Sequence, residues 1–308
     1  MYDIIGDTHG HARRLQALLT KLGYSPQAGV WRHPQRKALF LGDFVDRGPE
    51  QLETVQMIKA MVETHAALAL LGNHEFNAVA FAMEDPTNPG GFLRTHTLKN
   101  RNQHQQFLDQ VGENSALHHE LLDWFKTLPL AIELDGLRAV HACWHPACLQ
   151  VAKPWLNDQG ALRDDTAWIL ANRKSSVLFT AVETLLKGVQ APLPHGMFFV
   201  DKEGVRRTAV RARWWDRSAR TYAELGHLTE DPRHVIPSVP VDASGMPGYD
   251  NAKLVFFGHY WLDGTPRPIE PQIACLDYSE TRTPPVGKMC AYRWLGETEL
   301  DPAHFVWV

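Results

Sequence analysis

The chain has 308 residues, of which 44% are hydrophobic and 21% are charged, a composition that predicts a globular protein with a large core and argues against a disordered chain. The formal net charge is −4 and both signs are mixed along the sequence, so the charge pattern does not favour nucleic acid as a partner. The four cysteines form no C-x-x-C pair and are too few for a disulfide scaffold, so we expect reduced thiols.

The first 75 residues alternate between short apolar runs, polar turns and amphipathic segments. Residues 1–5, 37–41 and 67–71 are expected to be buried strands. Helices are expected over 11–22, where four leucines fall on one face, and after Pro49, which suits a first helical turn. This rhythm predicts βαβ units with a largely parallel sheet, in which ligands bind beyond the carboxyl ends of the strands.

Beyond residue 80 the pattern is less regular. We expect a polar helical segment at 100–126 and a β-hairpin over 130–140 that turns at Asp135-Gly136. Further strands are expected at 197–200, 253–257, 272–276, 289–294 and 305–308. Because no internal repeat is visible, we predict a single domain over 1–308, with a helical insertion at about 80–127 and an irregular insertion at about 150–250.

Three polar turns follow the three N-terminal strands, and each begins with glycine. Their sequences are Gly6-Asp7-Thr8-His9-Gly10, Gly42-Asp43-Phe44-Val45-Asp46-Arg47-Gly48 and Gly72-Asn73-His74-Glu75. His141 and His259 also follow expected strands. Carboxylate, imidazole and carboxamide groups at these five turns predict a site for two divalent metal ions, which suits hydrolysis of phosphate esters. Single turns of this kind often only cap helices, but five in order favour the metal site.

Oxygen and nitrogen ligands are expected at the two ions. The six expected ligands are Asp7, His9, Asp43, Asn73, His141 and His259. Asp7 and His9 stand two apart on a turn and can face one ion, while both oxygens of Asp43 can bridge the pair. Because thiolates are absent from the set, we expect manganese, with iron or zinc as alternatives to it.

The three turns resemble the G-D-x-H-G, G-D-x-x-D-R-G and G-N-H-E motifs of calcineurin-like metallophosphoesterases. The Asp-Arg-Gly step resembles that of the phosphoprotein phosphatase branch, which includes bacterial and phage Ser/Thr protein phosphatases and symmetrical diadenosine tetraphosphatases. The match is tight over 3–77 and looser at His141 and His259. It implies an α/β (α+β) calcineurin-like metallophosphatase fold, in which helices flank a central β-sandwich with a dinuclear metal site at one edge.

The resemblance also implies roles for three residues of the second and third turns. His74 is expected to be the general acid that protonates the leaving oxygen, and Asp46 is expected to orient its ring. A neighbouring carboxylate keeps an imidazole charged and aimed, which fits this role. Arg47 is expected to bind the phosphate, because a guanidinium group matches phosphate oxygens in bidentate fashion.

A second phosphate-binding arginine is expected before the last metal ligand. Trp215-Asp216-Arg217 resembles the W-x-R step of phage and bacterial members, so Arg217 is the prediction, with Arg211 and Arg213 as competitors. Tyr260 replaces the usual threonine, and Asp277 either orients a ligand or ends a strand. Four tryptophans near these segments are interpreted as core residues, with base stacking as the alternative: Trp144, Trp214, Trp215 and Trp261.

These patterns predict an enzyme, a metallophosphoesterase in which a metal-bridging hydroxide attacks phosphorus in line. The main expectation is hydrolysis of phosphomonoesters, including Ser/Thr phosphoproteins; the alternative is hydrolysis of bis(5′-nucleosyl) tetraphosphates. A nuclease or phosphodiesterase is a further alternative, disfavoured by the step at 46–48 and by the lack of a basic groove. A silent binding protein should lack ligands, and here all are present. No signal peptide or run of ~20 apolar residues is visible, so we expect no membrane partner and a cytoplasmic location.

Overall fold

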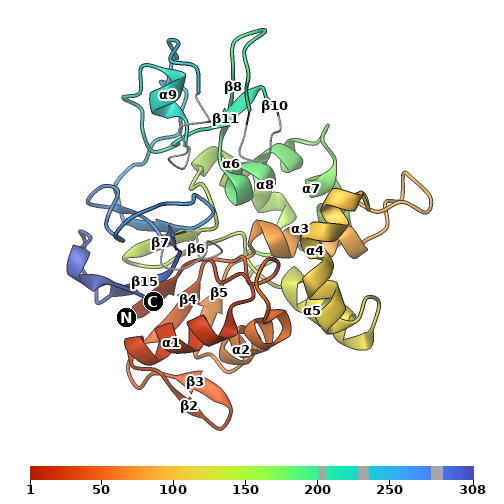
Figure 1. The fold of residues 1–308 in the computed structure, drawn as a ribbon, viewed down its shortest axis with the longest axis vertical. Helices are drawn as coiled ribbons and strands as arrows, with labels where there is room; N and C mark the ends of the chain where they lie inside the picture. The colour runs from red at the N-terminus through yellow and green to blue at the C-terminus, as the bar shows by residue number, and fades with distance from the viewer. Residues whose placement is uncertain (201–205, 228–235, 279–286) are drawn as a thin grey trace.

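The structure is a computed structural model that describes residues 1–200, 206–227, 236–278 and 287–308. Two β-sheets form its centre, and helices α1 and α2 lie against the larger sheet (Figure 1). Helices and strands are both present, and the two sheets with flanking helices are the mixed architecture that the motifs predict. Among the described residues, no helix is long and apolar enough to cross a membrane.

The larger sheet contains the three strands that precede the N-terminal polar turns, and they lie side by side. Its order is β14-β15-β1-β4-β5, and β16 pairs with β15. Its members are β1 (Tyr2–Ile5), β4 (Lys37–Phe40), β5 (Ala67–Ala69), β14 (Asp277–Tyr278), β15 (Lys288–Trp294) and β16 (Phe305–Trp307). Strands β1, β4 and β5 are parallel, which confirms the expected βαβ arrangement, whereas β15 is antiparallel to β1.

The second sheet has four strands in the order β13-β12-β7-β6. They are β6 (Ala131–Glu133), β7 (Leu137–Val140), β12 (Leu254–Phe257) and β13 (Ile273–Cys275). Strands β7, β12 and β13 are parallel, and the antiparallel pair β6–β7 confirms the expected hairpin. Successive side chains of β1 point to opposite faces of the larger sheet. Ile4 packs with Phe256 between the two sheets, while Ile5 packs with the helices on the outer face.

Five helices follow the N-terminal strands. They are α1 (Ala12–Leu22), α2 (Gln51–Glu63), α3 (Asn73–Ala82), α4 (Leu98–Val111) and α5 (Ala116–Lys126). The four expected leucines of α1 are buried, and Gly23 ends the helix with φ 93°, a left-handed conformation that glycine adopts without strain. The polar helical segment expected at 100–126 is two helices, because Gly112 interrupts it with φ 75°.

The segment at 150–250 is more regular than expected in its first part. Helix α6 (Pro146–Ala152) leads into this segment. It is followed by a short 3₁₀ turn (Lys153–Trp155), α7 (Asp165–Asn172) and α8 (Val177–Lys187). Ser176 caps the N-terminus of helix α8, because its side chain accepts a hydrogen bond from the N–H of Leu178, and the buried residues of α8 follow helical spacing. The prediction of an irregular segment is therefore wrong for 165–187, where cap and spacing do specify helices.

Short elements complete the described chain. The remaining ones are β2 (Ser25–Gln27), β3 (Val30–Arg32), β8 (Gln190–Pro192), β9 (Phe199–Val200), β10 (Arg206–Arg207), β11 (Ala209–Arg211), α9 (Tyr222–Leu225) and a 3₁₀ turn (Pro302–His304). Strands β8 and β11 pair with each other, and a small cluster that includes Leu193, Val210 and Leu225 packs around them. The expected strand at 197–200 is reduced to the two residues of β9.

Candidate metal centre

The expected ligands meet at one edge of the sandwich. Asp7 follows β1, Asp43 follows β4, and Asn73 begins α3 beyond the end of β5. In the other sheet, His141 directly follows β7 and His259 follows β12. Within each sheet these strands are parallel, so their carboxyl ends lie together and bring distant residues into one buried cluster.

Two groups of side chains in this cluster have the spacing of metal ligands. In one, His9 Nε2 lies 3.8 Å from Asp7 Oδ2 and 3.7 Å from Asp43 Oδ2. In the other, His141 Nε2 lies 3.3 Å from Asp43 Oδ1 and 3.0 Å from Asn73 Oδ1. Ligand atoms on one ion at about 2.1 Å stand roughly 3.0–3.4 Å apart, which is close to these values. Asp43 faces both groups, one through each oxygen.

Hydrogen bonding leaves the ligand atoms of this cluster available. His9 Nδ1 lies 3.1 Å from the carbonyl of Val45, and His141 Nδ1 lies 2.7 Å from that of Leu41, so each Nδ1 donates and each Nε2 keeps a lone pair. Three buried atoms of the expected ligands have no hydrogen-bond partner among the described residues: Asp7 Oδ1, His9 Nε2 and His259 Nε2. Unpaired buried polar atoms are costly, so a cation between them fits the donor set.

Buried acidic charge also suits this cluster to cations. Burial, with Asp277 and Asp43 nearby, raises the pKa of Asp7 well above its ordinary value. Burial lowers the pKa of His9 and His259 well below the usual range, so both rings are neutral and able to bind a metal. Although burial would lower it, the charge of Asp43 raises the pKa of His141, so among the ligand histidines only this ring compensates a carboxylate of the cluster. Carboxylates beside the neutral rings of His9 and His259 are poorly compensated in a buried site unless it holds cations.

Backbone conformation at the turns is strained. His9, Asp43, Asp46, Arg47 and His259 all have φ between 42° and 74°, a region that side chains other than glycine rarely occupy. Such strain persists only where the surrounding structure fixes it, and it is typical of functional sites. The turns therefore hold the ligands in defined positions before any ion binds.

Asp46 connects two histidines beside the cluster. Its Oδ2 lies 2.6 Å from His74 Nδ1, as expected, and its Oδ1 lies 2.7 Å from His104 Nδ1. Although burial would raise the pKa of Asp46, the hydrogen bonds from both rings hold it below the ordinary value. Sequence reasoning missed His104, because its place in the polar helix α4 carries no motif. Arg47 lies close, with Nη2 3.4 Å from His74 Nε2.

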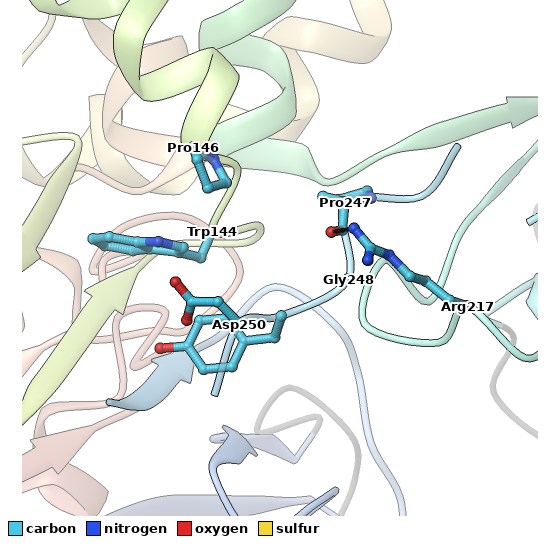
Figure 2. A pocket seen from close by; sticks show the side chains of 7 residues that line it. Trp144, Pro146, Arg217, Pro247, Gly248 and Asp250 are labelled. Atoms are coloured by element: carbon cyan, nitrogen blue, oxygen red, sulfur yellow. Dashed lines mark hydrogen bonds between the residues drawn. The ribbon is translucent and has the colours of Figure 1, made fainter. Parts of the chain in front are cut away.

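The structure places the candidate arginines differently from the prediction. Arg217 donates from Nε to the carbonyl of Met246 at 3.0 Å, and its Nη2 bonds the carbonyl of Pro247. It lines a separate cavity beside Trp144 (Figure 2). Arg211, a competitor in the sequence, donates to the carbonyl of His259 at 3.1 Å and so lies beside the ligands.

The structure also places three further residues near the candidate metal centre: Tyr260, Asp277 and Cys143. Tyr260 is fully buried and donates to the carbonyl of Ala212 at 2.9 Å, so it anchors the core below His259. Asp277 is buried at the start of β14, and its charge is one cause of the raised pKa of Asp7. Cys143 is also buried, and burial raises its thiol pKa well above the ordinary value, which agrees with a packing role.

Comparison with known proteins gives the same family as the motifs. The family described as calcineurin-like phosphoesterase matches residues 2–178. Asymmetrical bis(5′-nucleosyl)-tetraphosphatase PrpE of Oceanobacillus iheyensis is 29% identical over 141 residues, which is 46% of this chain and 54% of that protein. The protein of that name from a Geobacillus species is 32% identical over 141 residues, covering 46% and 55%. The chain spans about half the length of these curated relatives.

Solved structures show the same fold at low sequence identity. A protein serine/threonine phosphatase from Saccharomyces cerevisiae aligns over 100% of this chain and 78% of its own, with a TM-score of 0.52 and 14% identity. The family match covers more than half of the chain and includes all three N-terminal turns and His141. The chain therefore belongs to the calcineurin-like phosphoesterase family and is a metallophosphoesterase.

Proposed function

We propose that this phosphoesterase hydrolyses bis(5′-nucleosyl) tetraphosphates asymmetrically, to a nucleoside triphosphate and a nucleoside monophosphate. The observation that carries the proposal is the similarity over 141 residues to two proteins named for that activity. The alternative expectation from the sequence is thus better supported than the main one, hydrolysis of phosphomonoesters and phosphoproteins. The relatives are named as asymmetrical enzymes, whereas the motifs pointed to symmetrical ones.

The donor set of the cluster fits two divalent ions. One would be held by Asp7, His9 and Asp43, and the other by Asp43, Asn73, His141 and His259. Bound there, the ions would supply Lewis acidity that activates a water molecule and neutralises phosphate charge. Mixed oxygen and nitrogen ligands favour manganese, with iron or zinc as alternatives.

The side chains around the cluster can bind the substrate and manage its proton. Arg47 would bind phosphate oxygens, and Arg211 stands where a second guanidinium would reach them. Water adds its oxygen to phosphorus, the bond from that phosphorus to one bridging oxygen breaks, and the departing phosphate leaves with that oxygen. His74, held by Asp46, would donate the proton that the departing oxygen needs.

Product analysis tests the proposal. We would incubate the Mn²⁺-loaded protein with diadenosine tetraphosphate and, in parallel, with a phosphoserine/phosphothreonine peptide, and resolve the products. ATP with AMP is the expected result, and two ADP would show symmetrical cleavage instead. Phosphate release from the peptide without turnover of the dinucleotide would overturn the proposal.

A variant of the shared ligand provides the control. Asp43→Asn keeps the shape of the side chain but removes the charge that both ligand groups face. We expect it to lose bound manganese and turnover together, which would tie any dinucleotide hydrolysis to this site. Full activity of Asp43→Asn would assign the hydrolysis to a contaminant or to another site.

A further inference from the structure

The four tryptophans near the motif segments divide into two kinds. Trp214 is fully buried and donates from Nε1 to the carbonyl of Ala142 at 3.0 Å, and Trp144 is 5% exposed. Trp215 and Trp261 are only partly buried, and both form walls of a cavity of about 700 Å³. The expectation of core residues therefore suits the first pair, while the second pair reaches an accessible space.

The cavity adjoins the candidate metal centre through one aromatic side chain. Trp261 follows the ligand His259 by two residues, and the guanidinium carbon of Arg47 lies 4.6 Å from the centre of its ring. Arg47 Nη2 in turn lies 3.4 Å from His74 Nε2. A molecule in the cavity would thus lie against the wall that carries the phosphate-binding arginine.

The walls combine aromatic rings with guanidinium groups. Besides Trp215 and Trp261, the lining includes Tyr278, the two arginines Arg213 and Arg267, and one acidic residue, Asp263, so that positive charge exceeds negative charge. The Tyr278 hydroxyl accepts from the backbone N–H of Arg267 at 3.0 Å, which fixes the loop that carries this arginine. The volume falls within the ~300–1,000 Å³ typical of small-molecule sites.

Each group has a partner in a nucleotide. Aromatic side chains stack on bases of any identity, and guanidinium groups bind phosphate oxygens as charged forks. A phosphoserine peptide offers phosphate but no base, so it lacks the flat aromatic group that would stack on Trp215 and Trp261. The composition of the cavity therefore favours a nucleotide over a phosphopeptide.

We infer that this cavity binds one nucleoside end of the dinucleotide, with its base against Trp215 and Trp261 and its phosphates reaching Arg213 and Arg267. The inference rests on the proposed function and names the recognition element of the same site. Because stacking does not distinguish bases, diadenosine and diguanosine tetraphosphate should be cleaved at similar rates.

Kinetics of the Mn²⁺-loaded 308-residue protein test the inference. The readout is the kcat/KM for diadenosine tetraphosphate divided by that for p-nitrophenyl phosphate, which carries a phosphate but no nucleobase and no second phosphate. In Arg267→Gln we expect this ratio to fall about tenfold, because a charge-assisted hydrogen bond contributes roughly that factor. Arg32→Gln removes the same charge from β3, at the far end of the molecule in Figure 1, and should keep the ratio.

A second variant and a binding measurement complete the design. Trp215→Leu should lower the same ratio; because Trp215 packs against Phe257 and Tyr260, its folding is checked by thermal melting. Binding of a fluorescent N-methylanthraniloyl derivative of AMP, measured without turnover, should weaken in both Arg267→Gln and Trp215→Leu. Trp261 is left intact, because its ring supports Arg47.

The outcomes separate the two proposals. Wild-type hydrolysis of the dinucleotide, with ratios and AMP-derivative binding unchanged in both cavity variants, would overturn the inference and leave the function standing. Hydrolysis of p-nitrophenyl phosphate alone, with AMP-derivative binding that the variants weaken, would support the cavity and overturn the proposed substrate.

Discussion

A single carboxylate, that of Asp46, accepts hydrogen bonds from two buried histidines through its two oxygens. His74 and His104 are each less than 5% exposed, so the three side chains form a buried hydrogen-bonded chain. A ring fixed in this way holds Nε2 in one orientation beside the candidate metal centre, 3.8 Å from Asp43 Oδ2. How much a protonating group contributes then depends on the leaving group, because a departing phosphate needs its proton less than a departing alkoxide.

His74→Asn should therefore affect two substrates unequally. For an alkyl phosphomonoester, we expect kcat to fall about 10²–10⁴-fold, the usual contribution of a general acid. For diadenosine tetraphosphate the fall should be much smaller. Steady-state kinetics on both substrates, with bound manganese measured in the same samples, checks this. Equal losses on both substrates would remove His74 as the proton donor.

His104 offers a matched pair of variants. His104→Asn can keep a donor near the position of Nδ1, whereas His104→Leu cannot hydrogen-bond to Asp46. We expect kcat for an alkyl phosphomonoester to fall about tenfold or more in His104→Leu, since a hydrogen bond to a charged group contributes about 1.5–3 kcal/mol. The Asn variant should recover most of this loss. If the two variants were equally impaired, His104 would serve packing rather than positioning.

At the scale of elements, the site is made by the carboxyl ends of parallel strands in two sheets. Close approach of these turns leaves little space, and glycine is needed where they touch. A side-chain carbon at Gly258 would collide with the carboxylate of Asp7, which belongs to the other sheet. The geometry of the ligands at this edge therefore depends on glycine at position 258, which has no side chain.

Gly258→Ala should weaken metal binding while the protein still folds. The added methyl would displace the Asp7 carboxylate from the first ligand group, so we expect Mn²⁺ affinity to fall at least about tenfold, as removal of a supporting contact typically does. Titration calorimetry with Mn²⁺ measures this. Gly245→Ala, where an added carbon would meet open space, is the control. Unchanged affinity in Gly258→Ala would contradict the crowding argument.

Local signals explain what the sequence could predict of these elements. The turns after β1, β4 and β5 were predictable because an apolar run, a glycine and a ligand follow one another within a few residues. Helix α8 has a readable cap and apolar spacing, but it was missed because Pro192 and Pro194 shortly after it mark the segment as irregular. Arg211 and His104 could not be assigned, since each meets its partner through packing of distant segments: β11 against the loop of His259, and α4 against Asp46.

At the scale of the whole molecule, the candidate metal centre joins the two sheets. Asp7, Asp43 and Asn73 follow strands of the larger sheet, while His141 and His259 follow strands of the smaller one. Ions bound there would bridge the sandwich at one edge. Because such a site exists only when both sheets are assembled, binding would stabilise the folded state over the unfolded one.

Metal should accordingly raise thermal stability. At a free Mn²⁺ concentration of 100 times Kd, one ion contributes about 2.7 kcal/mol to the free energy of unfolding. We expect calorimetry to show a higher Tm for Mn²⁺-loaded protein than for protein kept in EDTA. Asp43→Asn should show little of this increase. An equal rise of Tm in Asp43→Asn would mean that the stabilising ions bind elsewhere.

Acid should destabilise the molecule partly through His118. Its Nδ1 accepts from the N–H of Asn114 at 3.1 Å, which requires the neutral ring. Burial, with nearby His104 and His119 outweighing Glu113, lowers its pKa to about 4. A lowered folded pKa means that the unfolded chain takes up the proton first, so stability is retained above about pH 6.5 and is lost as pH falls toward 4.

The size of this effect can be measured with one variant. Between pH 7 and pH 5 the linkage amounts to about 2 kcal/mol of unfolding free energy. In His118→Gln the amide oxygen can still accept from the N–H of Asn114. Between pH 7 and pH 5, urea unfolding should show that this variant loses roughly 2 kcal/mol less unfolding free energy than wild type does. Parallel losses in both proteins would assign the acid sensitivity to other groups.

The order of strands in the larger sheet has a consequence for how the chain folds. Strand β1 lies between β4 and β15, so Ile5 pairs with Phe40 on one side and with Ala291 on the other. The pairing of β1 with β15 joins residues far apart in the sequence, so it has a high contact order. It forms late, because the entropy of closing the long loop is lost before the new contacts stabilise the pair. During synthesis, the three N-terminal motifs would leave the ribosome long before β15 does. The complete set of expected ligands, which includes His259, can therefore assemble only once synthesis has reached the last quarter of the chain.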